Sequence, residues 1–129
     1  MKQNTHLEIN HSLSGEILKL EQHYSKIQLQ TTSEMRVDKM GLIHGGFIFS
    51  LADFAAMVAI NHPNVVLGGA NVRFLKPVRE GDIVIAEAQL SKKEGKKLIV
   101  DVEIKRSNEI IFNGEFICFT PDTYILGDD

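Results

Sequence analysis

The longest apolar stretch of the chain is HGGFIFSLADFAAMVAI, residues 44–60. After Gly46 its only polar side chains are Ser50 and Asp53, and it is rich in alanine and free of internal glycine and proline. These features favour a helix over a strand. Because proline disfavours helical geometry in the preceding residue, Asn61-His62-Pro63 predicts the end of this helix. A helix that is apolar on all sides must be buried on all sides.

Alternating apolar and polar side chains predict strands on both sides of this helix. Before the helix, residues 26–30 alternate and are predicted as a strand. Residues 12–21 are predicted as a short helix with a serine N-cap. Residues 1–11 are predicted as an arm or a first strand. After it, four alternating segments separated by short turns predict an antiparallel meander: residues 70–74, 84–90, 98–105 and 110–120. Residues 121–129 are predicted as a flexible tail.

One long apolar helix and several antiparallel strands define an α+β domain. With 129 residues, 43% of them apolar, the chain forms one hydrophobic core, so residues 1–129 are predicted as a single domain. A curved antiparallel sheet wrapped around the helix covers only one of its sides. We therefore expect the other side to meet a second subunit, most simply in a homodimer.

Composition excludes several classes of protein. The formal net charge of −3 argues against a nucleic-acid partner, and no apolar run reaches the ~18 residues of a membrane span. Cys118 has no second cysteine to pair with, which favours a reducing compartment. We therefore expect a cytoplasmic protein that binds neither nucleic acid nor a membrane. The histidines show no metal-ligand spacing, so no metal site is expected.

Asp53 is the unusual residue of the long helix. A carboxylate between Ala52 and Phe54 costs several kcal/mol unless it is paired or hydrogen-bonded. Desolvation raises the pKa of such a group into the range that suits a general base. The alternative is a carboxylate that faces solvent at a subunit edge or bonds Ser50 locally.

His44-Gly45-Gly46 directly precedes the helix. Glycine lets a ligand or another chain approach the backbone closely, and unpaired N–H groups at a helix N-terminus polarise a carbonyl or an oxyanion. The alternative is that the two glycines only form a tight turn while His44 caps the loop. A carboxylate nine residues after the histidine makes the combination more specific than the three residues alone.

These segments resemble a known family. IHGGFIFSLADFAAMVAIN followed by VRFLKPVREGD is similar, over residues 27–119, to the hotdog-fold acyl-CoA thioesterases of the phenylacetate-pathway type. The resemblance implies the hotdog fold, a dimer or dimer of dimers, and active sites between subunits. It implies hydrolysis of an acyl-CoA thioester, with Asp53 as base or nucleophile, Gly45 N–H bound to the thioester oxygen and His44 orienting the loop. No cofactor is implied, since coenzyme A is part of the ligand.

One position departs from this pattern. Six residues before the histidine, many members have an asparagine that places water or substrate, and this chain has Asp38. A second carboxylate shares a proton with Asp53 if the two are close, and otherwise serves only the loop. Some hotdog proteins bind acyl-CoA without hydrolysing it, so a regulatory acyl-CoA-binding protein is the alternative function.

Further resemblances bear on this choice. MKQNTHLEIN, AAMVAIN and NVVLGG are similar to a small hotdog protein associated with the flagellar regulon in Campylobacter and Helicobacter relatives, which favours the regulatory alternative. Hydroxyacyl dehydratases also use a histidine with a carboxylate, but their proline-rich stretch is absent. A dimer with a purely structural role is a third interpretation.

Coenzyme A is an anion with a long thin arm, which favours Lys and Arg around a narrow slot. Arg73 and Lys76 flank the end of a predicted strand and are candidates for this role. Phe54 and Met57 are candidates for lining an acyl tunnel, and Gly46 is a further candidate substrate-binding residue. The alternatives are a solvated strand edge for the two cations and ordinary core packing for the two apolar residues.

Overall fold

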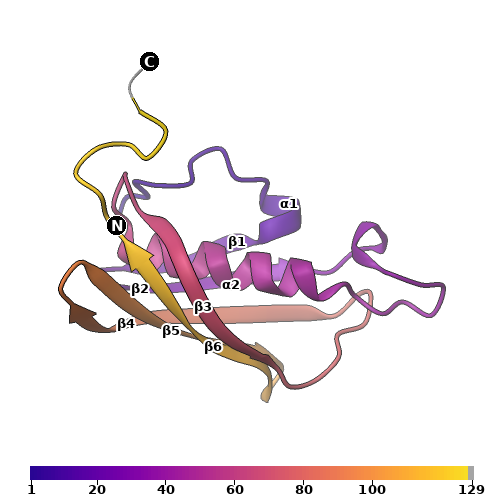
Figure 1. The fold of residues 1–129 in the computed structure, drawn as a ribbon. Helices are drawn as coiled ribbons and strands as arrows, with labels where there is room; N and C mark the ends of the chain where they lie inside the picture. The colour runs from indigo at the N-terminus through magenta and orange to yellow at the C-terminus, as the bar shows by residue number, and fades with distance from the viewer. Residues whose placement is uncertain (128–129) are drawn as a thin grey trace.

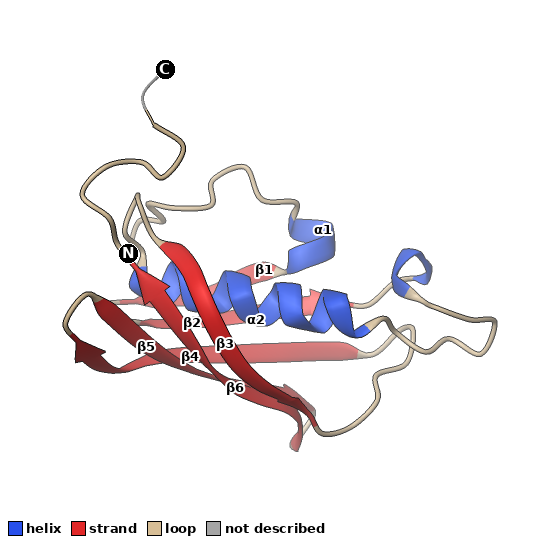
Figure 2. Ribbon diagram, in the orientation of Figure 1, coloured by secondary structure: helices blue, strands red, loops and turns tan. Residues whose placement is uncertain are grey.

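The structure, a computed structural model, describes residues 1–127. Its elements are α1 (His11–Ser14), β1 (Glu16–Glu21), β2 (Tyr24–Gln30), a 3₁₀ turn η1 (Ser33–Met35), α2 (Gly45–Ile60), β3 (Val66–Phe74), β4 (Ile83–Glu94), β5 (Lys97–Arg106) and β6 (Glu109–Phe119). One antiparallel sheet in the order β1-β2-β4-β5-β6-β3 curves around α2 (Figures 1 and 2). The predicted α+β architecture is therefore confirmed.

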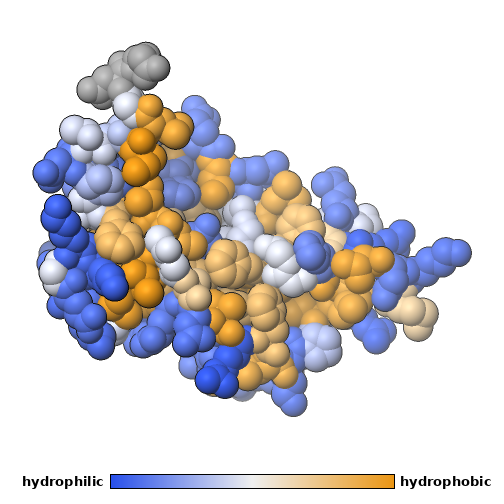
Figure 3. Space-filling view, in the orientation of Figure 1, coloured by the Kyte–Doolittle hydropathy of each residue, from blue (hydrophilic) through white to orange (hydrophobic). Residues whose placement is uncertain are grey.

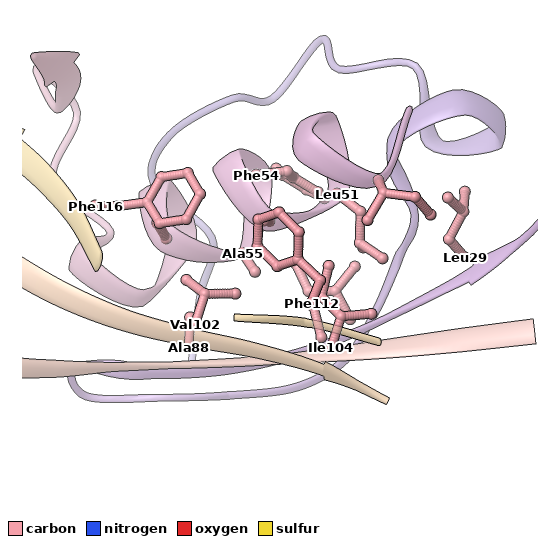
Figure 4. Packing of buried hydrophobic residues seen from close by; sticks show 14 of the residues in the cluster. Leu29, Leu51, Phe54, Ala55, Ala88, Val102, Ile104, Phe112 and Phe116 are labelled. Atoms are coloured by element: carbon pink, nitrogen blue, oxygen red, sulfur yellow. The ribbon is translucent and has the colours of Figure 1, made fainter. Parts of the chain in front are cut away.

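The core lies between α2 and the concave face of the sheet. Alternate positions of β2, β4 and β5 point at the helix and are buried, among them Leu29, Ala88 and Ile104 (Figure 4). The helix presents alanines to the sheet, and this small side chain lets the two layers approach closely. Ser25 Oγ donates a hydrogen bond to the carbonyl of Ala55 at 2.7 Å, so this buried polar side chain of β2 is satisfied.

The predicted helix over residues 12–21 is wrong. The helix is limited to α1, with Asn10 as N-cap, and it ends at Gly15, whose φ of +108° suits glycine. Residues 16–21 form the edge strand β1, in which Ile17 and Leu20 are half-buried. Residues 1–10 contain no strand, so they form the arm rather than a first strand.

The predicted four-strand meander is only partly correct. β4, β5 and β6 follow one another as hairpins, but β3 pairs with β6 at the far edge of the sheet, from Val66 opposite Phe119 to Phe74 opposite Phe112. The Phe119 ring covers Gly68, where any Cβ would overlap it. β3 therefore leaves one of its edges unpaired among the described residues.

The N-terminal arm covers part of α2 on the side away from the sheet (Figure 1). The helix ends at Asn61, as predicted from Asn61-His62-Pro63, and Asn61 adopts the left-handed conformation. Asn61 also binds the arm twice. Its Oδ1 accepts from Asn4 N–H at 2.7 Å, and its Nδ2 donates to the Lys2 carbonyl at 2.8 Å. The arm thus covers part of the side of α2 on which a second subunit is expected. No helix in residues 1–127 is long and apolar enough to cross a membrane.

The tail predicted over residues 121–129 is described as far as Gly127. It contains a turn in which Gly127 N–H donates to the Tyr124 carbonyl at 3.0 Å. Residues 128–129 lie outside the described part of the chain.

Candidate active site

Two loops fix the start of α2. His44 is the N-cap; its N–H donates to the Met35 carbonyl at 2.9 Å, and Ile43 N–H donates to the Val78 carbonyl at 2.9 Å. The His44 side chain makes no cap hydrogen bond, is exposed, and meets the Phe47 ring edge-on at 5.9 Å between centroids. It packs over Gly46, since a Cβ there would lie 2.7 Å from His44 Nε2. The histidine therefore shapes this turn, and a larger residue than glycine would displace it.

Gly45 opens onto a hollow at the N-terminus of α2. A Cβ on Gly45 would lie 3.3 Å from the Phe74 ring, so glycine permits this close approach. The hollow has a volume of about 360 Å³. Besides Gly45 and Phe74 it is lined by Lys76 and by apolar side chains: Ile43, Ile48, Leu75, Pro77, Val78 and Ile111. The structure therefore brings two predicted site residues, Gly45 and Lys76, together.

The backbone N–H groups of Gly45 and Gly46 are available for a ligand. They are the first two of the helix, which has no carbonyl one turn earlier to accept from them, and neither donates to another group within residues 1–127. Such N–H groups stabilise negative charge on an oxygen. The arrangement suits a thioester carbonyl at Gly45.

Asp53 is a largely buried carboxylate with an unsatisfied oxygen. Its Oδ1 is shielded from solvent and has no hydrogen-bond partner in the described chain. Burial raises the pKa of Asp53 to about 6, as expected from its apolar neighbours. The suggested local bond to Ser50 is not formed, because Ser50 Oγ pairs with Ser14 Oγ at 2.9 Å. A buried carboxyl with a raised pKa and an unpartnered oxygen suits the role of a general base.

The neighbours of Asp53 place it toward β6. Burial, with a smaller contribution from the Asp53 charge, raises the pKa of the buried Cys118 thiol to about 12. Phe49, one helical turn before Asp53, packs against Phe116 of β6 at 5.4 Å between ring centroids, and Phe116 pairs with Ala70 of the open strand β3. Asp53 therefore faces the side of the molecule on which β3 is unpaired.

Asp53 and Gly45 of one chain are too far apart to act on one thioester. They are eight residues apart on the same helix, which corresponds to about 12 Å along its axis. A base, a water molecule and a carbonyl in contact span only about 6 Å. Within one chain these two groups therefore do not form a single site.

Asp38 serves its own loop. It is exposed, and its Oδ1 accepts from the N–H groups of Met40 and Leu42 at 2.9 and 3.2 Å. Burial alone accounts for the raised pKa of Asp53, with no contribution from Asp38. Within one chain the two carboxylates therefore do not form a proton-sharing pair.

The remaining predicted ligand residues lie away from the hollow at Gly45. Arg73 lies on the outer face of the sheet, where it lines a separate polar hollow of about 610 Å³. Phe54 and Met57 are core residues, each about 1% exposed, and Phe54 packs against the His6 and His11 rings at 6.2 and 5.9 Å. No group of three or more metal-binding side chains is assembled within residues 1–127.

The main residue that sequence analysis missed is Phe74. It is 55% exposed, contacts Phe112 edge-on at 5.1 Å and lies over Gly45. Alternation did assign Phe74 to the apolar side of its strand, but its contact with Gly45 depends on the position of β3 beside β6. That pairing joins distant parts of the chain and has no signal in a local pattern.

Comparison with known proteins identifies the family. The sequence model of the Thioesterase superfamily matches residues 40–111, and the chain belongs to that family. Among solved structures, an uncharacterized protein from Pyrococcus horikoshii is 43% identical, with a TM-score of 0.96 and 98% of both chains covered. A sigma28-regulated virulence protein from Campylobacter jejuni is 35% identical, with a TM-score of 0.91 and 95% of both chains covered.

More distant structures support the fold. The E. coli PaaI protein of the phenylacetic acid degradation operon superposes with a TM-score of 0.78 at 23% identity, over 87% of this chain and 83% of PaaI. A Streptococcus pneumoniae hypothetical thioesterase with coenzyme A gives 0.75 at 17% identity, over 84% and 87%. The resemblance found in the sequence, to both the phenylacetate-pathway thioesterases and the Campylobacter protein, is therefore confirmed.

Curated relatives are longer than this chain. A methylthioribose-1-phosphate isomerase from Aquifex aeolicus is 52% identical over 125 residues, which are 96% of this chain and 27% of that protein. Transcription factor FapR from Caldanaerobacter subterraneus is 33% identical over 104 residues, 80% of this chain and 52% of FapR. The chain thus spans about half or less of these relatives, and their activities are not transferred to it.

Proposed function

We propose that this protein hydrolyses an acyl-CoA thioester at sites formed between two copies of the chain. The observation on which the proposal rests is the buried, unpartnered Oδ1 of Asp53, with its pKa raised to about 6, on the side of α2 that one chain leaves partly open. Membership of the Thioesterase superfamily and the neighbour with coenzyme A support the substrate class.

In the proposed dimer, β3 of one chain pairs with β3 of the second chain. β3 has nine residues and a single charge, Arg73, whereas the opposite edge strand β1 has six residues of which three are charged. Charged side chains protect an edge from pairing, and β3 lacks that protection. A two-fold axis across β3 makes the pairing antiparallel and places two open helix faces against each other. This arrangement supplies Gly45 of the partner subunit to Asp53.

The proposed reaction uses few groups. Asp53 accepts a proton from a water molecule as the water oxygen attacks the thioester carbonyl carbon. The N–H of Gly45 of the partner subunit donates to the carbonyl oxygen, where negative charge develops. The C–S bond then breaks and Asp53 returns the proton to sulfur, which yields a carboxylic acid and free coenzyme A. Lys76, at the hollow, provides a positive charge for the phosphates of coenzyme A.

Release of free thiol from acetyl-, octanoyl- and palmitoyl-CoA tests this proposal. Asp53→Asn preserves shape and removes the base, so we expect kcat to fall by about 10²–10⁴-fold. Asp101→Asn changes an exposed carboxylate on the outer face of the sheet and serves as the matched control. Equal thiol release by Asp53→Asn and the unaltered protein would contradict the assigned role.

The second candidate is a regulatory acyl-CoA-binding protein without turnover. Two observations favour it: similarity to transcription factor FapR over 80% of the chain, and the use of the Asp38 carboxylate by its own loop. Calorimetric binding of the same acyl-CoA set without thiol release would establish this function in place of hydrolysis. A protein that neither binds nor hydrolyses any of them would have the purely structural role.

A further inference from the structure

We propose that the C-terminal turn of one protomer, residues 121–127, covers the hollow beside Gly45 in the other protomer. The proposal rests on the β3-paired dimer of the proposed function and adds a second element that each copy contributes to its partner's site.

The C-terminal turn is bonded to Asn64 at its start and exposes its apolar side chains. Asn64 Nδ2 donates to the Pro121 carbonyl at 3.1 Å, and Gly127 N–H donates to the Tyr124 carbonyl at 3.0 Å. Three consecutive large side chains nevertheless face solvent: Tyr124, Ile125 and Leu126 are 51%, 62% and 76% exposed. In Figure 3 hydrophobic surface continues from this segment down over the face on which β3 lies. An exposed apolar surface of this kind favours a contact with another protein surface.

The hollow beside Gly45 has a matching open side. Phe74 and Leu75 line it and are 55% and 45% exposed, and Pro77 adds apolar surface. Both surfaces are thus apolar and uncovered within residues 1–127.

Strand register determines which copies of these surfaces meet. The C-terminal turn follows Phe119, which pairs with Val66 at the start of β3, whereas Phe74 ends that strand. These two ends of β3 are about 26 Å apart, so the turn is remote from the hollow of its own chain. In an antiparallel pair of β3 strands, the start of one strand lies beside the end of the other. The turn then lies against residues 74–77 of the partner subunit.

Charge favours the same contact. The turn contains Asp122 and no basic residue, whereas residues 73–79, Arg-Phe-Leu-Lys-Pro-Val-Arg, contain three cations and no acid. Asp122 is exposed and forms no ion pair within the described residues. The second copy therefore supplies both an apolar and an electrostatic complement.

The contact has a consequence for the site. Covering the hollow removes water from the side chains around Gly45 and lowers the local dielectric constant. A hydrogen bond from Gly45 N–H to a developing oxyanion is stronger in such surroundings.

Cross-linking between two differently tagged, co-expressed variants tests the proposal. One chain carries Leu75→Cys and the other Ile125→Cys, both at exposed positions, and the mixture is treated with a short bis-maleimide; the native Cys118 is buried and unreactive. We expect a cross-linked heterodimer. The control replaces Leu75→Cys by Leu18→Cys, an exposed residue of β1, and gives none.

Light scattering on the same samples distinguishes failure of the proposed contact from failure of the proposed dimer. A dimer without the cross-link overturns the covering turn and leaves the inter-subunit site intact, whereas a monomer overturns the dimer itself. As a second measurement, Ile125→Ser with Leu126→Ser changes only exposed side chains, and we expect the dimer Kd to rise about tenfold in sedimentation. Leu18→Ser leaves it unchanged. An unaltered Kd for the double variant would contradict the contact.

Discussion

The two sides of α2 have nearly the same hydrophobicity and opposite surroundings. On the side facing the sheet, Ile48, Leu51 and Ala55 are at most 2% exposed. On the other side, Gly46, Phe49, Asp53 and Ile60 recur at helical spacing and all remain partly or largely exposed in one chain. The first side is closed by the chain's own sheet, and the second is closed only in part. Apolar composition therefore predicts that a helix is buried, and the neighbouring strands decide what buries each side.

The largest effect is expected on the closed side. Leu51→Ala removes a fully buried side chain and leaves a cavity, so we expect the free energy of unfolding to fall by about 2–5 kcal/mol. Phe49→Ala on the open side removes a larger but half-exposed side chain and should cost less, which urea unfolding of the two variants measures. An equal or larger loss for Phe49→Ala would mean that the open side also maintains the fold of the single chain.

On the open side of α2, ionisation of Asp53 is expected to lower the free energy of unfolding. Because burial raises the pKa of this carboxyl from 3.8 to about 6, the folded protein holds the proton more tightly than the unfolded chain does. The free energy of unfolding therefore falls as the pH rises from about 4 to above 6, by about 3 kcal/mol in total from this group. Asp53→Asn has no such penalty. The difference between the two proteins in unfolding experiments across this range isolates the effect.

The sequence predicted the elements better than their pairing. Residues 44–60 form a helix because their length and alanine content are local properties, and β2, β4, β5 and β6 follow from two-residue alternation. The segment 16–21 was misassigned because Glu-Ile-Leu-Lys-Leu-Glu fits a helix as well as a strand, and only Gly15 separates it from α1. The edge position of β3 depends on its pairing with β6, which no local pattern records.

The candidate site also combines features that the local sequence predicts with features that depend on the pairing of distant strands. The buried, raised-pKa state of Asp53 was predictable because its sequence neighbours are apolar. The different locations of Arg73 and Lys76 were not, because β3 ends between them: Arg73 faces outward from the sheet, and Lys76 follows the strand end into the hollow at Gly45. The contact of Phe74 with Gly45 needed the three-dimensional structure for the same reason.

A smaller effect is expected on the rate of hydrolysis. If Asp53 is the base, only its ionised form is active, so kcat/KM falls about tenfold for each pH unit below 6 and levels off above it. The pH dependence of thiol release from octanoyl-CoA measures this. A profile that is flat between pH 5 and 7 would exclude Asp53 as the group whose ionisation controls the reaction.

The smallest effect on stability is expected at Asp38, which lies in the exposed loop before α2. Its carboxylate oxygen accepts two backbone N–H bonds in an exposed loop, and an asparagine side-chain oxygen can accept the same two. Asp38→Asn should therefore change the free energy of unfolding by less than about 0.5 kcal/mol. Its effect on turnover is the informative one, because an asparagine side chain can donate a hydrogen bond to water or substrate as well as accept one. Faster thiol release in Asp38→Asn, with unchanged binding of octanoyl-CoA, would show that this position limits turnover. An unchanged rate would assign Asp38 to its loop alone.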